Sequence, residues 1–269
     1  MKLEYKNIVV MGGCSGIGLA LVNALYHIAG TKIAIIDIDD SVLRRLQDGH
    51  ADRILTLRCD LTDRAQIEET FGALLDPKTI LNGEIDLFIS VAGMGYYETF
   101  DHTDLAHIEK IFALNVFAPI YALGRMAAHQ KARPFHFVIV SSAVAQVPVA
   151  GYSLYSSTKA ALSNFVRAYQ LEKPAHISIS CVYPVAVKTP FYSKAGPDAK
   201  IPLVRQSMRG TVRGILDGIQ QDKVEIYPSK LYRGMRAVKR LIPAAVTPYN
   251  KLEQHRFQQW RKNHTKKYP

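Results

Sequence analysis

Apolar and polar positions alternate in blocks along most of the chain, and these blocks predict an α/β fold. Short apolar runs rich in β-branched residues predict strands at 6–11, 32–37, 54–59, 86–90, 135–141, 177–182 and 224–227. Apolar residues at helical spacing predict helices near 16–29, 40–48, 63–75, 103–130, 153–172 and 206–220. Such alternation is typical of a parallel sheet covered by helices on both faces. We therefore expect one doubly wound, Rossmann-type domain over residues 1–228, with a mainly parallel seven-stranded sheet.

The pattern changes in a C-terminal extension, residues 229–269. Leu231, Met235, Val238 and Ile242 follow helical spacing, with basic residues among them. From position 230 onward there are 11 Lys or Arg and one acid, Glu253, a net charge of +10 out of +11 for the whole chain. This is the pattern of a basic amphipathic helix.

Two interpretations of this helix remain open. It fits peripheral contact of residues 230–267 with an anionic membrane, where Tyr249, Phe257 and Trp260 would add interfacial contacts, or an acidic protein. Alternatively, its apolar side chains pack against the protein's own core or a neighbouring subunit. No nucleic-acid-binding motif accompanies the charge, so we expect no nucleic-acid partner.

Composition is consistent with one soluble domain. The chain has 269 residues, of which 48% are hydrophobic, enough for a large core. Residues 8–30 carry no Asp, Glu, Lys or Arg, but glycines interrupt this stretch and no secretory signal is evident. Three cysteines and nine histidines show no metal-ligand spacing, so we expect no metal and a reduced, cytoplasmic protein.

A glycine-rich turn follows the first predicted strand and opens the first predicted helix. Gly12, Gly16 and Gly18 allow backbone to approach a pyrophosphate, and the N–H groups of the helix N-terminus attract it. Asp37 ends the second strand, where a carboxylate accepts hydrogen bonds from the adenosine ribose and repels a 2′-phosphate. The turn and Asp37 together predict NAD rather than NADP as the cofactor.

A tyrosine and a lysine lie four residues apart in the predicted helix 153–172. Tyr155 and Lys159 share one helix face, with Cβ atoms roughly 5–6 Å apart. A phenol ordinarily titrates near pH ~10, and a neighbouring ammonium is expected to lower that pKa toward useful acid–base chemistry. Ser142 is placed to hydrogen-bond a substrate oxygen at the same point.

Together, these motifs and their spacing resemble the short-chain dehydrogenase/reductase family over roughly residues 5–228. The resemblance implies a catalytic set of Asn115, Ser142, Tyr155 and Lys159. It also implies a cofactor-binding set, with the pyrophosphate on the glycine turn and a segment after strand six at the nicotinamide: Gly12, Cys14, Ser15, Gly16, Ile17, Gly18, Asp37, Asp60, Leu61, Ala92, Gly93, Tyr155, Lys159, Val187 and Thr189. Residues 190–205 correspond to the family's substrate lid.

Some positions depart from the family pattern. Met11, Val91 and Val185 replace the threonine, asparagine and glycine that are usual there, which affects cofactor loops rather than the catalytic set. In the family, the helices here at 103–130 and 153–172 commonly pair across a dimer axis, so a homodimer or homotetramer is implied.

The function implied is NAD-dependent hydride transfer between nicotinamide and an apolar secondary alcohol or ketone, with Tyr155 as acid and base. Two alternatives are reduction of a 3-oxoacyl thioester and an NAD-binding sensor or interaction protein that uses the basic extension.

Overall fold

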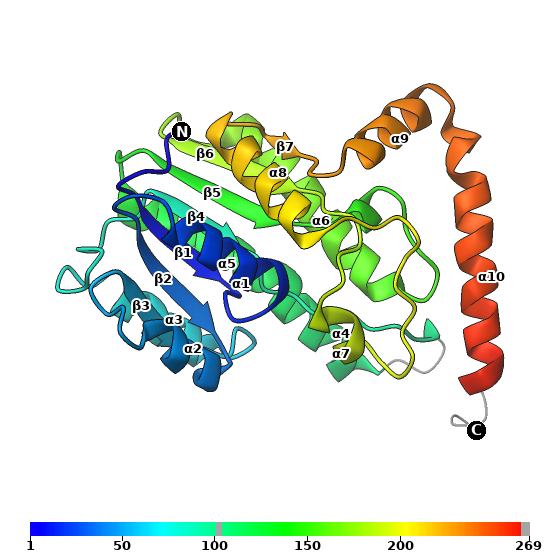
Figure 1. The fold of residues 1–269 in the computed structure, drawn as a ribbon, viewed down its shortest axis with the longest axis horizontal. Helices are drawn as coiled ribbons and strands as arrows, with labels where there is room; N and C mark the ends of the chain where they lie inside the picture. Colours follow the sequence, from blue (N-terminus) through cyan, green and yellow to red (C-terminus); the bar gives the residue numbers. More distant parts are fainter. Residues whose placement is uncertain (101–103, 265–269) are drawn as a thin grey trace.

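The computed structural model describes residues 1–100 and 104–264 of the chain, and its centre is one parallel sheet (Figure 1). The strand order is β3-β2-β1-β4-β5-β6-β7, and every neighbouring pair runs parallel. This confirms the predicted fold class. The strands are β1 (Asn7–Met11), β2 (Lys32–Asp37), β3 (Ile54–Arg58), β4 (Leu87–Ser90), β5 (Phe135–Val140), β6 (Ile177–Val182) and β7 (Glu225–Ile226).

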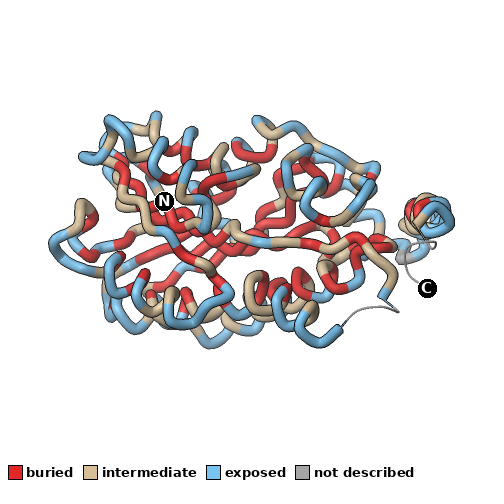
Figure 2. The backbone as a smooth tube through the Cα atoms, turned by 90° about the horizontal axis from the view of Figure 1, so that it is seen from below, coloured by how far each residue is buried: buried red, intermediate tan, exposed pale blue. Residues whose placement is uncertain are grey.

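Helices cover both faces of this sheet because successive strand residues point to opposite sides. On one face, Ile8 and Val10 belong to a core cluster with residues of α1 (Gly16–Tyr26), α2 (Asp40–Gln47) and α8 (Met208–Gln220). On the other, Val9 and Met11 pack with residues of α3 (Arg64–Leu74), α5 (Ala118–Gln130) and α6 (Ser153–Glu172). Figure 2 shows the strands as a buried layer between these two sets.

The order of the strands reverses between β1 and β4, which are neighbours in the sheet. In open α/β sheets, ligands bind outside the carboxyl ends of the strands at such a switch point. The glycine turn after β1 and the segment after β4 both lie at this place, so the fold positions a ligand site there.

The helix predicted at 103–130 is divided into three parts. After α4 (Leu105–Phe112) comes a π-helical turn, Ala113–Phe117, followed by α5; residues 101–103 lie outside the described part. By length and composition the stretch 105–130 is apolar enough to cross a membrane, yet 44% of its most apolar window is buried inside the protein. Its inward side chains, Ala122 and Met126 among them, belong to the core cluster.

The chain beyond β7 forms two helices rather than one. They are α9 (Lys230–Leu241) and α10 (Thr247–His264), joined by a 3₁₀ turn at 243–246. Tyr232 and Trp260 are buried against the domain, whereas Leu231, Val238 and Ile242 are exposed. Of the open interpretations, packing of Leu231 and Val238 on the protein's own core is therefore wrong, whereas a neighbouring subunit or a membrane stays a prediction. The apolar spacing was correctly recognised, but Tyr232 faces inward instead.

Candidate active site

The glycine turn brings backbone close to backbone. Gly12 has a φ of +93°, and a Cβ there would lie 2.4 Å from the backbone nitrogen of Ala92. A Cβ on Gly18 would lie 1.9 Å from the carbonyl oxygen of Gly12. Any other residue at these positions would therefore push the turn apart.

Helix α1 begins directly after this turn and presents its N-terminus to the cavity. Ser15, Gly16 and Ile17 line the cavity, and α1, unlike α2 or α3, has no side-chain cap among the described residues. Uncapped N–H groups and the helix dipole favour an anion at this point. The residues present therefore fit the pyrophosphate of a dinucleotide.

Asp37 braces the same turn. Its Oδ2 accepts a hydrogen bond from the backbone N–H of Cys14 at 2.8 Å, and its Oδ1 accepts from Ile38 N–H at 2.8 Å. Asp37, Ile38 and Asp60 all line the cavity. Asp37 Oδ1 also accepts from Asp39 N–H at 3.2 Å. Because a carboxylate oxygen has two lone-pair sites, Oδ2 retains capacity for one hydroxyl donor. This end of the cavity thus has two carboxylates and an apolar Ile38.

One continuous cavity of about 480 Å³ joins this end to a second, more apolar end. Its lining includes most of the predicted site residues: Gly12, Ser15, Gly16, Ile17, Asp37, Asp60, Leu61, Ala92, Gly93, Ser142, Tyr155, Lys159, Val187 and Thr189. Cys14, Gly18 and Asn115 are not part of the lining. Cys14 and Gly18 belong to the glycine turn itself, where the backbone N–H of Cys14 donates to Asp37. The roles expected of these two residues and of Asn115 stay predictions.

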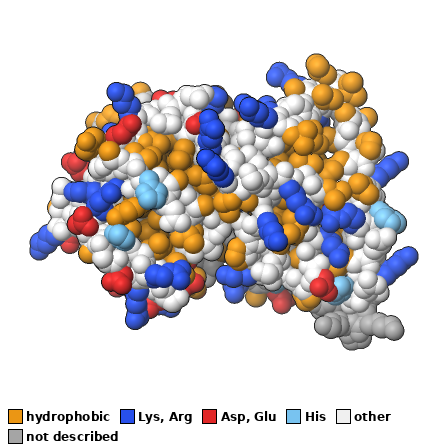
Figure 3. Space-filling view, viewed as in Figure 1, with side chains coloured by type: hydrophobic (Ala, Val, Ile, Leu, Met, Phe, Trp, Pro, Cys, Tyr) orange, Lys and Arg blue, Asp and Glu red, His pale blue; other side chains and the backbone are white. Residues whose placement is uncertain are grey.

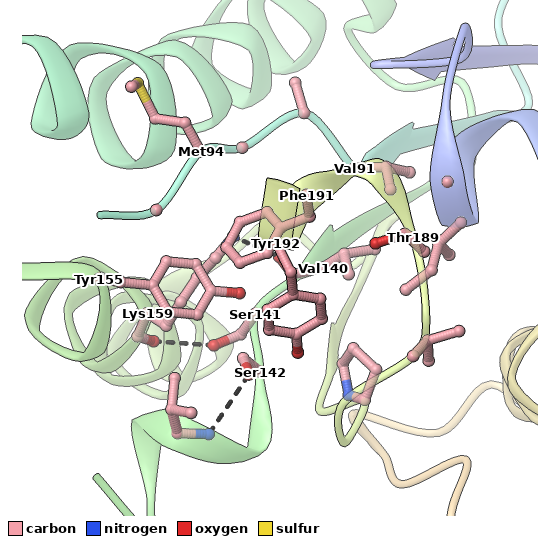
Figure 4. Close-up of a pocket in the computed structure, with 18 of the residues that line it drawn as sticks. Val91, Met94, Val140, Ser141, Ser142, Tyr155, Lys159, Thr189, Phe191 and Tyr192 are labelled. Carbon is pink, nitrogen blue, oxygen red and sulfur yellow. Dashed lines mark hydrogen bonds between the residues drawn. The ribbon is translucent and has the colours of Figure 1, made fainter. Parts of the chain in front are cut away.

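Tyr155, Ser142 and Lys159 lie together on one wall of the cavity (Figure 4). Ser142 follows β5, and its Oγ accepts a hydrogen bond from Val144 N–H at 3.3 Å. Lys159 is 3% exposed, and its Nζ donates to the carbonyl oxygen of Val140 at 3.0 Å. The Lys159 Nζ lies 5.7 Å from the centre of the Tyr155 ring. Helix α6 and the end of β5 thus hold all three groups rigidly.

Burial dominates the protonation of this pair. It raises the pKa of Tyr155 to about 12, while hydrogen bonding with Ser142 acts in the opposite direction. It lowers the pKa of Lys159 from 10.5 to about 8. The expectation that the neighbouring ammonium lowers the pKa of Tyr155 is therefore wrong for this structure, because desolvation by burial is the largest effect and raises that pKa. At neutral pH the phenol is protonated.

Asn115 lies in the π-helical turn and ties the loop after β4 to α6. Its Oδ1 accepts from Met94 N–H at 2.8 Å, and its Nδ2 donates to Met94 O at 2.8 Å and to Thr158 Oγ1 at 3.0 Å. Thr158 directly precedes Lys159. A Cβ on Gly93 would lie 3.3 Å from both Asn115 Oδ1 and Lys159 Nζ, so Gly93 keeps the path between them open. π-helical turns of this kind are frequent at functional sites.

The second end of the cavity is apolar and aromatic. Val144, Val149 and Tyr152 line it from the segment around α6, and Phe191 and Tyr192 from α7 (Pro190–Lys194), a short helix in the predicted lid. In Figure 4, the Tyr155 hydroxyl points toward the space between Ser142 and Tyr192. This end suits an apolar substrate whose oxygen reaches Tyr155 and Ser142.

The C-terminal extension supplies three further lining residues, which were not expected from the sequence. Tyr232, Met235 and Tyr249 line the cavity. Only Met235 belonged to the recognised apolar pattern, and nothing in one sequence shows which side of a helix faces a pocket.

Two other aromatic residues of the extension, Trp260 and Phe257, contact Tyr97 of the domain. The Trp260 ring lies 4.9 Å from that of Tyr97, and its Nε1–H donates to Pro197 O at 3.0 Å. Phe257 lies 5.6 Å from the same Tyr97 ring. Trp260 and Phe257 were expected at a membrane interface if the extension binds one, so that placement is wrong for these two residues.

Comparison with known proteins agrees with this geometry. Residues 6–200 match the family described as short chain dehydrogenase. The 3-ketodihydrosphingosine reductase of Dictyostelium discoideum is 30% identical over 213 residues, which are 72% of this chain and 63% of that protein. The chain thus spans less than two thirds of that relative's length.

Solved structures share the fold. A short-chain dehydrogenase from Sphingobium yanoikuyae in complex with NADPH has a TM-score of 0.73 at 22% identity, covering 89% of this chain and 95% of that one. One from Burkholderia phymatum in complex with NAD has a TM-score of 0.76 at 16% identity, covering 87% and 92%. The family match covers more than half of the chain, so the chain belongs to the short-chain dehydrogenase family.

Proposed function

We propose that this chain interconverts an apolar secondary alcohol and its ketone with NAD, using Tyr155 as the proton donor and acceptor. One observation carries the proposal: the Tyr155 hydroxyl, Ser142 and Lys159 share a wall of the cavity that also contains the uncapped N-terminus of α1. A dinucleotide along the carboxyl ends of the strands and a substrate in the apolar end would meet at that wall.

The cofactor-binding residues follow from the same lining. The turn from Gly12 to Gly18 would hold the pyrophosphate, Asp37 the adenosine ribose, and Lys159 the ribose next to nicotinamide. Val187 and Thr189 line the cavity beyond them, where the nicotinamide amide would bind. When bound, the nicotinamide supplies or accepts the hydride. Asp37 with Ile38 beside it favours NAD, since neither offers a cation for a 2′-phosphate.

The side chains of this chain account for the proton. A phenol whose pKa is about 12 is neutral at pH 7, so it can donate its proton to a ketone oxygen while the carbon gains a hydride. Oxidation of the alcohol reverses both transfers, and the alcohol proton returns to Tyr155. Ser142 hydrogen-bonds the reacting oxygen and stabilises negative charge that develops on it. Lys159 would pass the proton onward to solvent through a water relay that Asn115 would order.

The substrate is proposed from the second end of the cavity. Valine, phenylalanine and tyrosine side chains line it, and the charged residues in the lining of the whole cavity are Asp37, Asp60, Lys110, Lys159 and Lys194. The name of the Dictyostelium relative denotes reduction of a keto group. An apolar ketone substrate is consistent with the cavity lining and with that name.

A tyrosine substitution tests the proposal. Tyr155→Phe is expected to lower turnover by at least 10²-fold, since proton transfer by a positioned group typically contributes 10²–10⁴-fold, while NAD binding persists. Turnover is followed by NADH absorbance with ketones and alcohols of graded length, and NAD binding by calorimetry. The matched control is Tyr96→Phe, because Tyr96 stacks on His107 outside the cavity. Near-normal turnover in Tyr155→Phe would refute the assignment.

We also propose a cytoplasmic homodimer or homotetramer that touches anionic membranes peripherally through residues 230–267. The support is the charge of this extension, +10 in all. Each basic residue near an anionic surface contributes about 1 kcal/mol of attraction.

A further inference from the structure

Helix α9 has an outer apolar edge that the domain leaves uncovered. Leu231 is 64% exposed and Leu241 82%, with Val238 and Ile242 exposed between and after them. Figure 3 shows hydrophobic side chains gathered over α9 and the turn that follows it. Four large aliphatic side chains on three turns form a contiguous patch, and such patches mark interaction sites.

The inner edge of the same helix forms part of the cavity. Tyr232 and Met235 line it, and the Tyr232 hydroxyl donates to Ala143 O at 3.1 Å. Arg236 donates to Glu225 Oε2 at 2.9 Å, which fixes the rotation of the helix. Leu231 and Met235 are four residues apart and therefore adjacent on the helix surface. The exposed apolar edge thus continues directly into the wall of the cavity.

The charges around the patch have one sign. Lys230, Arg233 and Arg240 are exposed on α9. The acid of the extension, Glu253, is 4% exposed, pairs with Arg256 at 2.7 Å and accepts a hydrogen bond from Leu203 N–H at 2.8 Å. Its charge is therefore withdrawn from the surface, and the outer face of α9 presents aliphatic groups flanked by cations.

We propose that the outer edge of α9 lies on an anionic lipid bilayer, and that apolar substrate passes from the bilayer between α9 and α10 into the cavity. This rests on the proposed function, whose substrate it narrows to a membrane-dissolved long-chain ketone or alcohol. Aliphatic side chains flanked by basic ones match the acyl and headgroup layers of such a bilayer. A second copy of the chain fits less well, since a twofold interface on this patch would oppose like charges.

The test measures binding and turnover separately. Full-length protein is mixed with vesicles of phosphatidylcholine alone or with phosphatidylglycerol added, and the bound fraction is measured by flotation. Turnover is measured with 2-tridecanone dissolved in the vesicles and with the water-soluble 2-butanone. The variants are Leu241→Asp/Ile242→Asp, which changes the apolar edge, and Arg233→Glu/Arg240→Glu, which changes its charge. The matched control is Leu171→Asp, because Leu171 is 89% exposed at the far end of α6.

The expected result is binding to the anionic vesicles only. Each double variant should lower the bound fraction and the rate on vesicle-dissolved 2-tridecanone by at least tenfold, and leave the rate on 2-butanone unchanged. Leu171→Asp should change none of these.

Other results overturn the inference. The inference fails if wild type and both double variants bind vesicles equally. It also fails if the double variants lose the same fraction of their rate on both ketones. If wild type is a dimer and Leu241→Asp/Ile242→Asp is a monomer, the patch binds a second copy of the chain instead of a bilayer. If wild type reduces neither ketone, the proposed function itself fails, whereas flotation still reports on the surface.

Discussion

We expect the buried Lys159 of the candidate site to lower the free energy of unfolding. Lys159 is 3% exposed, and burial lowers the pKa of its ammonium from 10.5 to about 8. Below pH 8 the folded chain holds Lys159 as a buried ammonium, and burial disfavours this charged form. We therefore expect Lys159→Met, which fills similar volume without charge, to stabilise the protein at pH 7 and to abolish turnover.

The magnitude follows from the pKa difference. Each pKa unit corresponds to about 1.4 kcal/mol, so the buried ammonium costs about 3 kcal/mol of unfolding free energy at pH 7. Methionine also loses the hydrogen bond to Val140 O, and a buried acceptor left unpaired costs about 1–3 kcal/mol. The net expectation is a stabilisation of about 1–2 kcal/mol.

The pH dependence of the stability difference distinguishes an effect of the Lys159 charge from an effect of side-chain packing. Between pH 8 and 10.5 the unfolded chain holds a proton on Lys159 that the folded chain has lost, so wild type gains about 1.4 kcal/mol per pH unit relative to the variant. The two stabilities should cross between about pH 9 and 10. Urea unfolding of the cofactor-free proteins from pH 7 to 10 measures this. A variant that is less stable at pH 7, or a difference that does not change with pH, would refute the reasoning.

Three further predictions address the cofactor, the floor of the site and the extension. Asp37→Ala should raise the KM for NAD at least tenfold and narrow the preference over NADP; equal KM values for both cofactors in wild type would contradict this. Asn115→Leu, which removes three hydrogen bonds, should lower kcat and the melting temperature, whereas NAD affinity should change little; unaltered kcat would count against it. Trp260 is the single tryptophan and is 6% exposed. Tyr97→Ala should therefore shift its fluorescence emission to longer wavelength without loss of the far-UV circular dichroism signal. An unshifted emission spectrum would show that the packing of α10 does not depend on Tyr97.

Much of the fold followed from local pattern. The apolar runs predicted strand positions to within a residue or two, as Ile177–Val182 shows, because parallel strands buried on both faces are continuously apolar. The glycines and Asp37 were found because a turn that approaches backbone so closely tolerates few other residues. These are constraints that neighbouring residues in the chain impose on one another.

The features that were not predicted depend on residues distant in sequence. The raised pKa of Tyr155 comes from burial under the cavity wall, to which Phe191 of α7 contributes with a ring 5.0 Å away. The orientation of α9 is set by Tyr232 and Arg236, which reach Ala143 and Glu225. Helical periodicity gives spacing, but α9 is apolar on two edges, and only its tertiary partners decide which edge turns inward.

The wall contributed by Tyr232, Met235 and Tyr249 lies beyond residue 200, where the family match ends. Part of the cavity wall is therefore encoded downstream of the stretch that carries Ser142, Tyr155 and Lys159. Recombining the last forty or so codons among homologues would therefore change one wall of the cavity and leave those three residues in place.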